Sequence, residues 1–324
     1  MDILNWVELE IASNRSKEAP SARSVQGGSA FASMAWAMGT RFADTNSSFK
    51  SKCVFVLRSL LQPATSLTWF KCLHQTYLQK AVHGDASLLD AIHRPFFDHT
   101  IACGARLKLL SNHFRLSGML LGTKLAQDLA SGKPYEIATV SGKNHEEYSL
   151  ALFWGSSFKR EGGMTLGLFL QGKLLQCMTF SFDRENGQTV LRVGGVQACN
   201  QGGRDLIRES TKGLHGIQPR LLLIDALRCI AREINCAAIE CIAKKNHIYQ
   251  AWRYKFKKNI RAEYDALWVA AGGVAQANGN YRLPLVTQDK PLSERPTNKR
   301  SEYRAREQLT LAMRNDIACR LPLV

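Results

Sequence analysis

The chain has 324 residues, of which 45% are hydrophobic and 22% are charged, a balance typical of globular proteins. Lys and Arg number 43 against 27 Asp and Glu, which gives a formal charge of +16 at pH 7. This excess favours anionic partners such as nucleic acid, a membrane surface or a phosphorylated small molecule, without choosing among them. The sequence has neither a run of about eighteen uncharged apolar residues nor a secretory signal, so we expect a cytoplasmic protein that does not span a membrane.

The potential metal ligands are scattered. Nine cysteines lie in mostly apolar segments with no Cys-x-x-Cys pair, and we predict free thiols. His93 and His99 flank a ligand-like string, but Pro95 interrupts it and no third and fourth ligand stand nearby. Because a zinc site needs three or four ligands, we predict no metal.

The first third of the chain divides into a leader and a helical region. Residues 1–48 are rich in Ser, Ala and Gly, and we expect them to be loosely held. Over 49–132 the apolar spacing predicts helices, with a break near Gly118 or Gly122. The predicted helices cover Val54 to Leu61, which ends before Pro63, Leu67 to Val82, Leu88 to Ile92, and Arg106 to Leu129.

From residue 133 the apolar period becomes that of strands. Four strand-like runs are separated by Gly-containing hairpin turns and predict an antiparallel meander: 150–154, 164–170, 174–182 and 190–196. A helix over 219–234 begins at Pro219, and a buried strand over 236–243 follows. The order meander, helix, strand indicates an α+β core over 133–290. A charged, basic helix is expected within 291–324, usually a solvated element.

Half of the excess charge lies in one stretch. Residues 204–261 hold 13 Lys and Arg against five acids, and residues 244–261 carry seven cations and no acid. Tyr249, Trp252, Tyr254 and Phe256 interleave with these cations. Such a run binds a phosphate-bearing cofactor or nucleic acid, or is a solvated basic face whose aromatic residues belong to the core. We favour the cofactor over nucleic acid because the run leaves the end of an interior strand, where ligands commonly bind.

Two Gly-containing loops, 201–204 and 215–220, precede the helix that starts at Pro219. Backbone N–H groups at such a place bind anions. This succession of strand, loop, helix and strand resembles the acyl-CoA-dependent N-acyltransferase (GNAT) superfamily, in which a splayed strand completes the cofactor cleft. The resemblance implies acyl-CoA as the cofactor, held by Gln201, Gly202, Gly203, Arg204, Arg208, Lys212, Gly216, Arg220, Asn246 and Arg253.

The same resemblance assigns one catalytic residue. It implies that Tyr249, or Tyr254, protonates the leaving thiolate. One carboxylate or imidazole is enough to act as a general base for an amine, and Glu209, Glu240 and His215 are the candidates, with Glu240 or His215 favoured. Glu240 lies in the middle of a strand and is either buried for function or on the outward face of an edge. His215 lies in a Gly-flanked loop, where a structural or anion-binding role is the other interpretation.

Longer strings resemble the VirK/YbjX family of bacterial proteins over roughly residues 50–320. They are 210–223, 247–253, 262–268 and 281–284. This resemblance implies a bacterial cytoplasmic protein linked to virulence and envelope stress. With the GNAT-like core, it leads us to expect transfer of an acyl group, from acyl-CoA or an acyl carrier, to an amine on a peptide, protein or envelope-related acceptor.

The alternative hypothesis is a non-catalytic stress or virulence protein that binds anionic lipid or nucleic acid through its basic face. An acyltransferase requires a bounded cleft beside residues 193–204. A protein that only binds anions requires no more than a continuous positive surface. Nucleic acid is the less favoured of its partners.

Overall fold

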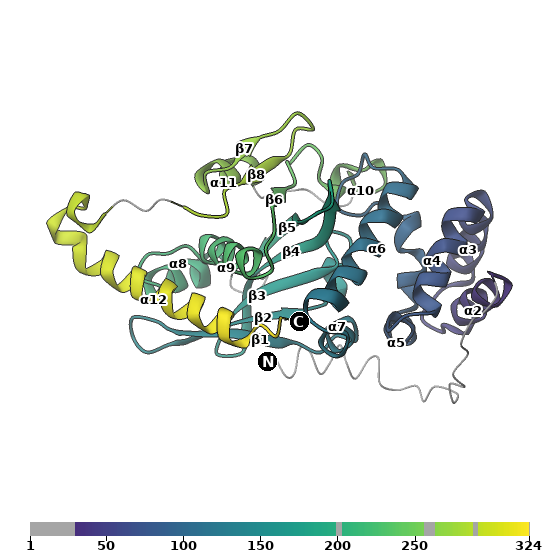
Figure 1. Cartoon of the computed structure of the whole chain (residues 1–324), viewed down its shortest axis with the longest axis horizontal. Coiled ribbons are helices and arrows are strands. Elements are labelled where there is room, and N and C mark those ends of the chain that lie inside the picture. Colours follow the sequence, from purple (N-terminus) through teal and green to yellow (C-terminus); the bar gives the residue numbers. More distant parts are fainter. Residues whose placement is uncertain (1–29, 199–202, 256–262, 288–290, 324) are drawn as a thin grey trace.

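The protein has an α+β fold in which one eight-stranded sheet is covered by helices on both faces (Figure 1). The computed structural model describes residues 30–198, 203–255, 263–287 and 291–323. The strand order is β1-β2-β3-β4-β5-β6-β8-β7. The strands are β1 (Tyr135–Ser141), β2 (Glu147–Phe153), β3 (Met164–Leu170), β4 (Lys173–Glu185), β5 (Gln188–Ala198), β6 (Ala238–Cys241), β7 (Val274–Ala275) and β8 (Tyr281–Leu283).

Helices precede the sheet, as the apolar spacing predicts. They are α2 (Ala30–Ala43), α3 (Phe49–Leu61), α4 (Pro63–His74), α5 (Leu78–Gly84), the 3-10 helix η1 (Ala86–His93), α6 (Cys103–Leu120) and α7 (Thr123–Ala130). The single helix expected over 67–82 is two helices. The break expected near Gly118 or Gly122 lies at Gly122, which has φ +76°. These helices share a core of their own that includes Trp69, Phe70 and Phe114.

Helix α2 lies inside the segment expected to be loosely held, and the structure differs there from that expectation. Ala37 is fully buried, and the Arg41 guanidinium donates to Asp90 of η1 at 3.1 Å. Ser33 Oγ is 3.2 Å from Nδ1 of His74. The small residues Ser33 and Ala37 of α2 are fully buried and allow close packing of this helix on α4 and η1. Residues 1–29 lie outside the described residues.

Helix α3 turns a different face to the core from the one that its sequence suggests. Its apolar residues Leu57, Leu60 and Leu61 are exposed, whereas Phe55 and Ser59 are buried. The contact of α3 with the rest of the helical region is narrow. One buried residue on each helical turn, first Phe55 and then Ser59, makes this contact. The wider apolar face of α3 remains exposed.

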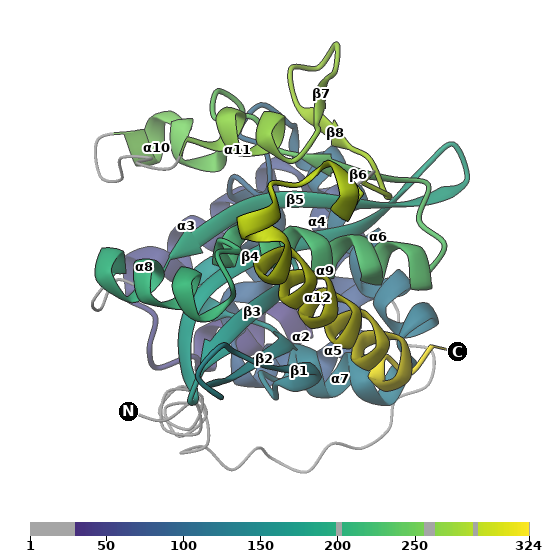
Figure 2. The ribbon, with the colours of Figure 1, turned by 90° about the vertical axis from the view of Figure 1, so that its left-hand side faces the viewer.

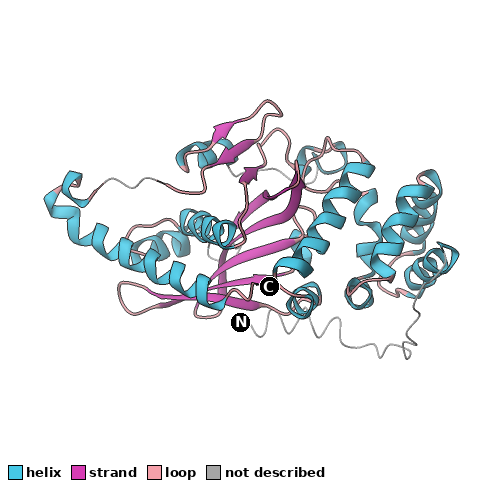
Figure 3. Ribbon diagram, viewed as in Figure 1, coloured by secondary structure: helices cyan, strands magenta, loops and turns pink. Residues whose placement is uncertain are grey.

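The antiparallel meander is confirmed, and it contains one more strand than the sequence predicts. Each of β1 to β4 pairs antiparallel with the strand that follows it, and β1, which the sequence analysis missed, forms the first edge. The chain then forms α8 (Gly203–Gly213), α9 (Pro219–Glu233) and β6, which runs parallel to β5 (Figure 3). The predicted order of meander, helix and strand is therefore present.

Helices cover the two faces of the sheet in different ways. Helices α9 and α12 (Arg300–Arg320) lie on one face, and α6 lies on the other, with the remaining N-terminal helices behind it (Figures 1 and 2). The charged helix expected near the C-terminus is α12, but it is not merely solvated. Leu309, Met313 and Ile317 bury one face of it in the core of the sheet. Asp316 also accepts the backbone N–H of Thr139 in β1 at 3.0 Å.

Shorter elements follow β6 and cover the end of the sheet. They are η3 (Ile248–Gln250), α10 (Trp252–Lys255) and α11 (Tyr264–Ala270), then β7 and β8. Three further short helices lie elsewhere in the chain: η2 (Ser156–Phe158) precedes β3, and η4 (Leu292–Glu294) and η5 (Thr297–Lys299) precede α12. The ladder of β5 and β6 ends at the pair Val193–Cys241, but β5 continues to Ala198. Ile242 still donates its backbone N–H to Val193 at 2.9 Å, and β5 then runs on alone at the end where the prediction places a splayed strand.

Candidate active site

The site begins where β5 runs on without β6 beside it. Tyr264, the first residue of α11, occupies this place: its hydroxyl accepts from the backbone N–H of Val196 at 3.2 Å and donates to the carbonyl of the same residue at 3.4 Å. Trp268, one turn later, donates its indole N–H to the Ile242 carbonyl at 2.8 Å. The two aromatic residues thus supply hydrogen bonds that a neighbouring strand would otherwise make.

A buried carboxylate lies next to this gap. Glu161 has no exposed surface. Its Oε2 accepts from the Thr179 hydroxyl at 3.1 Å, and its Oε1 accepts from Nε2 of Gln197 at 2.9 Å. Thr179 belongs to β4 and Gln197 to β5, so the carboxylate lies across the two central strands. Hydrogen bonds of this kind stabilise a charged carboxylate that has lost its water.

Two glycines of β5 make room for Glu161. A Cβ added at Gly194 would lie 1.8 Å from the Glu161 carbonyl oxygen, and one added at Gly195 would lie 1.8 Å from Oε2 of its carboxylate. Neither distance is possible between non-bonded atoms. Glycine inside a strand often marks such a close approach, and here it lets a whole residue lie against the sheet.

Tyr249 and His247 complete the cluster from the segment after β6. The Tyr249 phenol hydrogen-bonds to the Glu161 carboxylate, and burial together with that negative charge raises the pKa of Tyr249 well above its usual value. The ring of His247 accepts the Tyr249 backbone N–H on Nδ1 at 3.3 Å. A neutral ring then carries its proton on Nε2, which faces Oε1 of Glu161 at 3.9 Å. Burial lowers the pKa of His247 to about 4, so its ring is neutral at pH 7.

This arrangement is suited to moving a proton. Tyr249 is half-buried, whereas Glu161 has no exposed surface, so of this pair only Tyr249 is accessible from outside. A protonated phenol that is hydrogen-bonded to a carboxylate donates its own proton and takes another in its place. Tyr264 also has a raised pKa, because it is buried and close to Glu161. Both phenols therefore remain protonated at neutral pH.

Of the three predicted catalytic residues, the structure places Tyr249 in this cluster and Glu240 in a different network. The Glu240 carboxylate pairs with Arg192 of β5 and accepts from Asn278 at 2.9 Å and from Asn280 at 3.0 Å. Arg192 also donates to Asp183 at 2.6 Å. Glu240 is thus held by one cation and two amides, an arrangement expected of a structural carboxylate.

His215 and Gly216 lie elsewhere, in the loop between α8 and α9. Both have positive φ, 52° and 83°, and the His215 carbonyl accepts from Nε of Arg306 of α12 at 2.5 Å. Asn246 donates to Asn278 and Asn280, at 3.0 and 2.9 Å, and so holds the turn before β8. The structure does not bring Glu240, His215 and Tyr249 to one point, and the catalytic roles of the first two stay predictions.

The predicted cofactor-binding cations form two groups. Arg204, Arg208 and Lys212 recur every four residues and form one exposed line along α8, while Arg220 is exposed in the first turn of α9. Exposed side chains of like charge attract anions. Gly203 is the first residue of α8. Gln201 and Gly202 lie outside the described residues, and Arg253 lies in α10 with its side chain outside them.

Sequence reasoning missed Glu161, Gln197, His247 and Tyr264. Two signals were present. The pair Gly194-Gly195 interrupts an otherwise apolar strand, and His247 stands in the same family-like string, 247–253, as Tyr249. Neither signal points to Glu161, because Glu161 follows a 3-10 turn and its sequence is typical of a hairpin connection. Only the packing of that connection against β5 shows where its carboxylate lies.

The string with His93 and His99 holds two parts of the chain together. The backbone N–H of His99 donates to the Asn246 carbonyl at 3.0 Å, and its ring is 3.1 Å from the carbonyl of Lys245.

Over the part of the chain that the structure describes, no group of three or more His, Cys, Asp or Glu side chains is placed to hold a metal ion. The eight cysteines within that part are free thiols, as predicted. None of its helices is long and apolar enough to cross a bilayer.

Comparison with known proteins gives a family and little chemistry. The family model described as "Protein of unknown function (DUF535)" matches residues 44–318. The chain is 30% identical to the uncharacterized protein YbjX of Escherichia coli (strain K12), over 84% of this chain and 83% of that one. It is 23% identical to an uncharacterized protein of Haemophilus influenzae, over 75% and 80% of the two chains. A cAMP-binding acyltransferase from Mycobacterium smegmatis aligns over 68% of this chain and 63% of its own, at 11% identity. Its TM-score of 0.27 is too low to support an argument.

Proposed function

The chain belongs to the family described as "Protein of unknown function (DUF535)", the VirK/YbjX family, and from this premise we propose that it is an acyltransferase. Its donor is acyl-CoA or an acyl carrier, and its acceptor is an amine on a peptide, protein or envelope-related molecule. One observation carries the proposal. Tyr249, the residue that the GNAT resemblance selects as the acid, hydrogen-bonds to a fully buried carboxylate beside the gap between β5 and β6.

The proton path follows from the donors and acceptors of the cluster. The thioester supplies the acyl carbon that the amine attacks and the thiolate that leaves. The phenol of Tyr249 gives its proton to that thiolate. The phenolate left on Tyr249 then takes the proton that the amine loses, while the hydrogen bond to the buried Glu161 carboxylate holds the phenol in place. The proton lost by the amine is thereby balanced by the proton gained by the thiol, and the protein ends as it began.

The other residues of the cluster position these two. Thr179 and Gln197 fix the plane of the Glu161 carboxylate, and the Tyr249 backbone is held by Nδ1 of His247. The cations Arg204, Arg208 and Lys212 of α8, with Arg220 of α9, bind the phosphates of the donor. Helix α8 begins six residues after Gln197, so phosphate binding and proton transfer belong to the same end of β5.

Ligand-induced stabilisation tests the proposal first. The melting temperature is measured with coenzyme A, acetyl-CoA and long-chain acyl-CoAs, and with ATP and a DNA duplex as polyanion controls, at low and moderate salt. A ligand at a hundred times its dissociation constant adds about 2.7 kcal/mol of stability. We expect an acyl-CoA to stabilise the protein at both salt concentrations and beyond the effect of ATP. Equal shifts with every polyanion that vanish in salt would favour the anion-binding alternative.

Two variants separate donor binding from proton transfer. Arg220→Ala is expected to weaken acyl-CoA binding, because it removes a cation from the first turn of α9. Tyr249→Phe is expected to slow turnover with binding unchanged, because the phenol acts only as the thiolate leaves. An equal loss of affinity for all polyanions in both variants would contradict the assignment.

A further inference from the structure

Helix α3 turns an apolar face to solvent, at the opposite end of the molecule from the start of α12 (Figure 1). At 3.6 residues per turn, the exposed residues of this face lie within about a third of the helix circumference. They are Phe49, Cys53, Leu57, Leu60 and Leu61, which we call the α3 face. Its four large side chains are 58% to 76% exposed. A contiguous apolar face of this kind marks a contact with another molecule or with a membrane.

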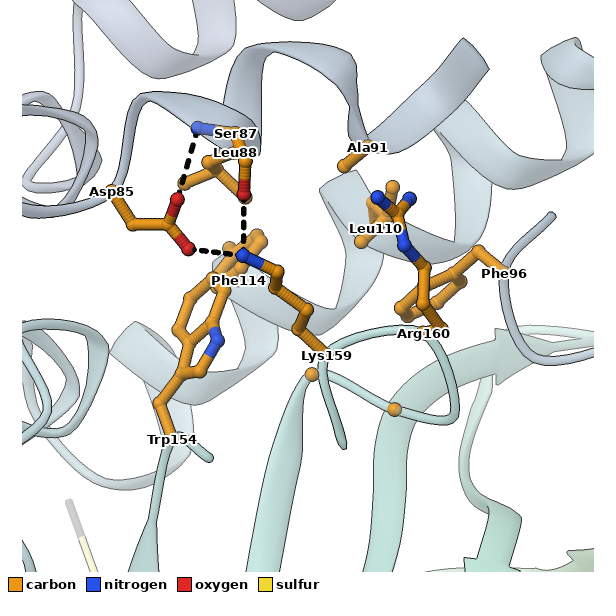
Figure 4. Close-up of a pocket in the computed structure, with 12 residues that line it drawn as sticks. Asp85, Ser87, Leu88, Ala91, Phe96, Leu110, Phe114, Trp154, Lys159 and Arg160 are labelled. Carbon is orange, nitrogen blue, oxygen red and sulfur yellow. Dashed lines mark hydrogen bonds and ion pairs between the residues drawn. The ribbon is translucent and has the colours of Figure 1, made fainter. Parts of the chain in front are cut away.

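The inner side of the same helical region is closed. Lys159, in the connection from β2 to β3, donates to Asp85 at 2.7 Å and to the Ser87 hydroxyl at 2.5 Å (Figure 4). The rings of Phe114 and Trp154 stack nearby, with their centroids 5.1 Å apart. The space left among these side chains is about that of one water molecule. The helices are therefore packed firmly on the rest of the protein, and the α3 face lies on their outer side.

The charges around the α3 face have one sign. Residues 49–84 contain five Lys and Arg and no Asp or Glu. Lys50 is exposed within the arc of the face, and Lys52 and Arg58 lie at its two edges. Lys52 also donates to the carbonyl of Phe42 at 2.7 Å, which brings this exposed residue of α2 beside α3. The apolar face is therefore bordered by cations.

This combination of apolar and basic side chains selects the kind of partner. If the face paired with the same face of a second copy, it would place like charges against each other, which is unfavourable. Leu and Phe side chains on a convex helix insert among lipid chains without a complementary groove. Lysines at the border of such a face keep their stems with the apolar groups and extend their charges to anionic headgroups.

We propose that the α3 face docks the protein on the surface of a membrane that contains anionic lipids. Helix α3 lies in the plane of the membrane, with Phe49, Leu57, Leu60 and Leu61 at the boundary between headgroups and acyl chains. Lys50 contacts the lipid phosphates. This surface belongs to the N-terminal helices and not to the basic stretch of residues 204–261. Docking is also independent of acyl transfer, so either one can fail while the other holds.

Sedimentation with lipid vesicles tests the docking on the full chain. Vesicles of phosphatidylcholine alone are compared, at moderate salt, with vesicles in which a quarter of this lipid is replaced by phosphatidylglycerol. We expect the partition coefficient to be at least tenfold higher on the anionic vesicles, because several cations next to an anionic surface add to the binding. Absence of binding to both kinds of vesicle would overturn the proposal.

Variants assign the binding to the α3 face. A chain with Leu57→Gln, Leu60→Gln and Leu61→Gln should lose at least tenfold in partition, because it removes the apolar side chains that enter the membrane. Glutamine forms helices about as well as leucine, and circular dichroism confirms that the variant is folded. Lys50→Gln should weaken binding to the anionic vesicles by about fivefold. Leu311→Gln is the control, because Leu311 of α12 is a leucine of similar exposure, 55%, and this variant should bind as the natural chain does.

Unchanged binding in the triple leucine variant, or an equal loss in Leu311→Gln, would place the membrane contact elsewhere and overturn the proposal. Light scattering without lipid measures the oligomeric state. A dimer that forms with rising concentration and disappears in the triple variant would assign the face to a second copy instead. Acyl transfer between a donor and an acceptor in solution should be normal in the triple variant, so that loss of docking is distinguished from loss of the proposed activity.

Discussion

The carboxylate of Glu161 occupies the space in which a side chain at residue 195 would begin. Gly195 is thus as much a part of the site as the residues that hydrogen-bond to Glu161. The same β5 segment carries Gln197, which donates to it at 2.9 Å. A short piece of strand therefore both admits the buried charge and stabilises it.

Gly195→Ala is expected to displace Glu161. The added methyl group would lie 1.8 Å from Oε2, and the atoms it meets are buried on all sides. Overpacking of this kind costs about 3 kcal/mol. A urea titration measures the loss of stability, and acyl transfer should fall with it. Gly104→Ala is the matched control, since nothing lies within 4 Å of its Cβ, and its stability should change by about 1 kcal/mol or less. Equal effects of the two substitutions would contradict the close approach of Glu161.

Tyr249→Phe is expected to lower the kcat of acyl transfer by about a hundredfold or more, because it removes the general acid and leaves the ring in place. KM for the donor should be nearly unchanged. Tyr254→Phe is the comparison, because the Tyr254 ring packs edge-on against the Tyr249 ring, with their centroids 6.0 Å apart. A larger effect at Tyr254 than at Tyr249 would move the acid to the second tyrosine.

Glu240→Gln separates a structural carboxylate from a catalytic one. Removing this charge leaves Arg192 with its ion pair to Asp183, and breaking such a buried pair costs about 3–5 kcal/mol. We expect a lower urea midpoint and, at a temperature where the variant is still folded, nearly normal turnover. A hundredfold loss of kcat with unchanged stability would instead assign Glu240 as the general base.

Stability should decrease as the pH falls from about 6.5 towards 4. Burial lowers the pKa of both His113 and His247 to about 4 in the folded protein. The unfolded chain, with ordinary histidines near 6.5, therefore binds protons over this range that the folded protein does not. Each histidine contributes a slope of about 1.4 kcal/mol per pH unit at most.

Urea titrations at pH 7, 6 and 5 measure this slope. His113→Gln should make the slope smaller, because it removes one of the titrating groups. The variant should still fold, because the glutamine amide oxygen can accept the backbone N–H of Phe182, which Nδ1 of His113 accepts at 3.2 Å in the natural chain. His83 is exposed, and His83→Gln should leave the slope as it was. If His113→Gln and His83→Gln gave the same slope as the natural chain, His113 would not be neutral in the fold.

Much of the sheet was predictable because its signals are local. Runs such as 164–170 are apolar and lie between glycine turns, and Pro219 marks the start of α9. Strand β1 was missed because Tyr135 to Ser141 alternates apolar and polar residues too briefly to be recognised before its partner is known. The splayed end of β5 came from the resemblance to a superfamily and not from the residues alone.

The chemistry of the site was less predictable because it depends on distant packing. Glu161 and Gly195 are 34 positions apart, and no spacing rule links a turn residue to a strand glycine. Glu240 looked exceptional as an acid in an apolar strand, yet its partner Arg192 lies directly opposite it in β5. A polar residue in a buried strand therefore needs its neighbour in the next strand before its role is assigned.

The pairing of α12 with β1 has a consequence for biosynthesis. Tyr135 donates its hydroxyl to the carbonyl of Arg320 at 2.6 Å, and these two residues are 185 positions apart. The first strand of the sheet therefore leaves the ribosome long before the helix that covers it exists. Until α12 has been translated, this edge and the apolar face shared with α9 are open to water and to other nascent chains. Production of this protein should depend on chaperones that occupy that face, and a chain stopped before Arg300 should aggregate rather than accumulate in folded form.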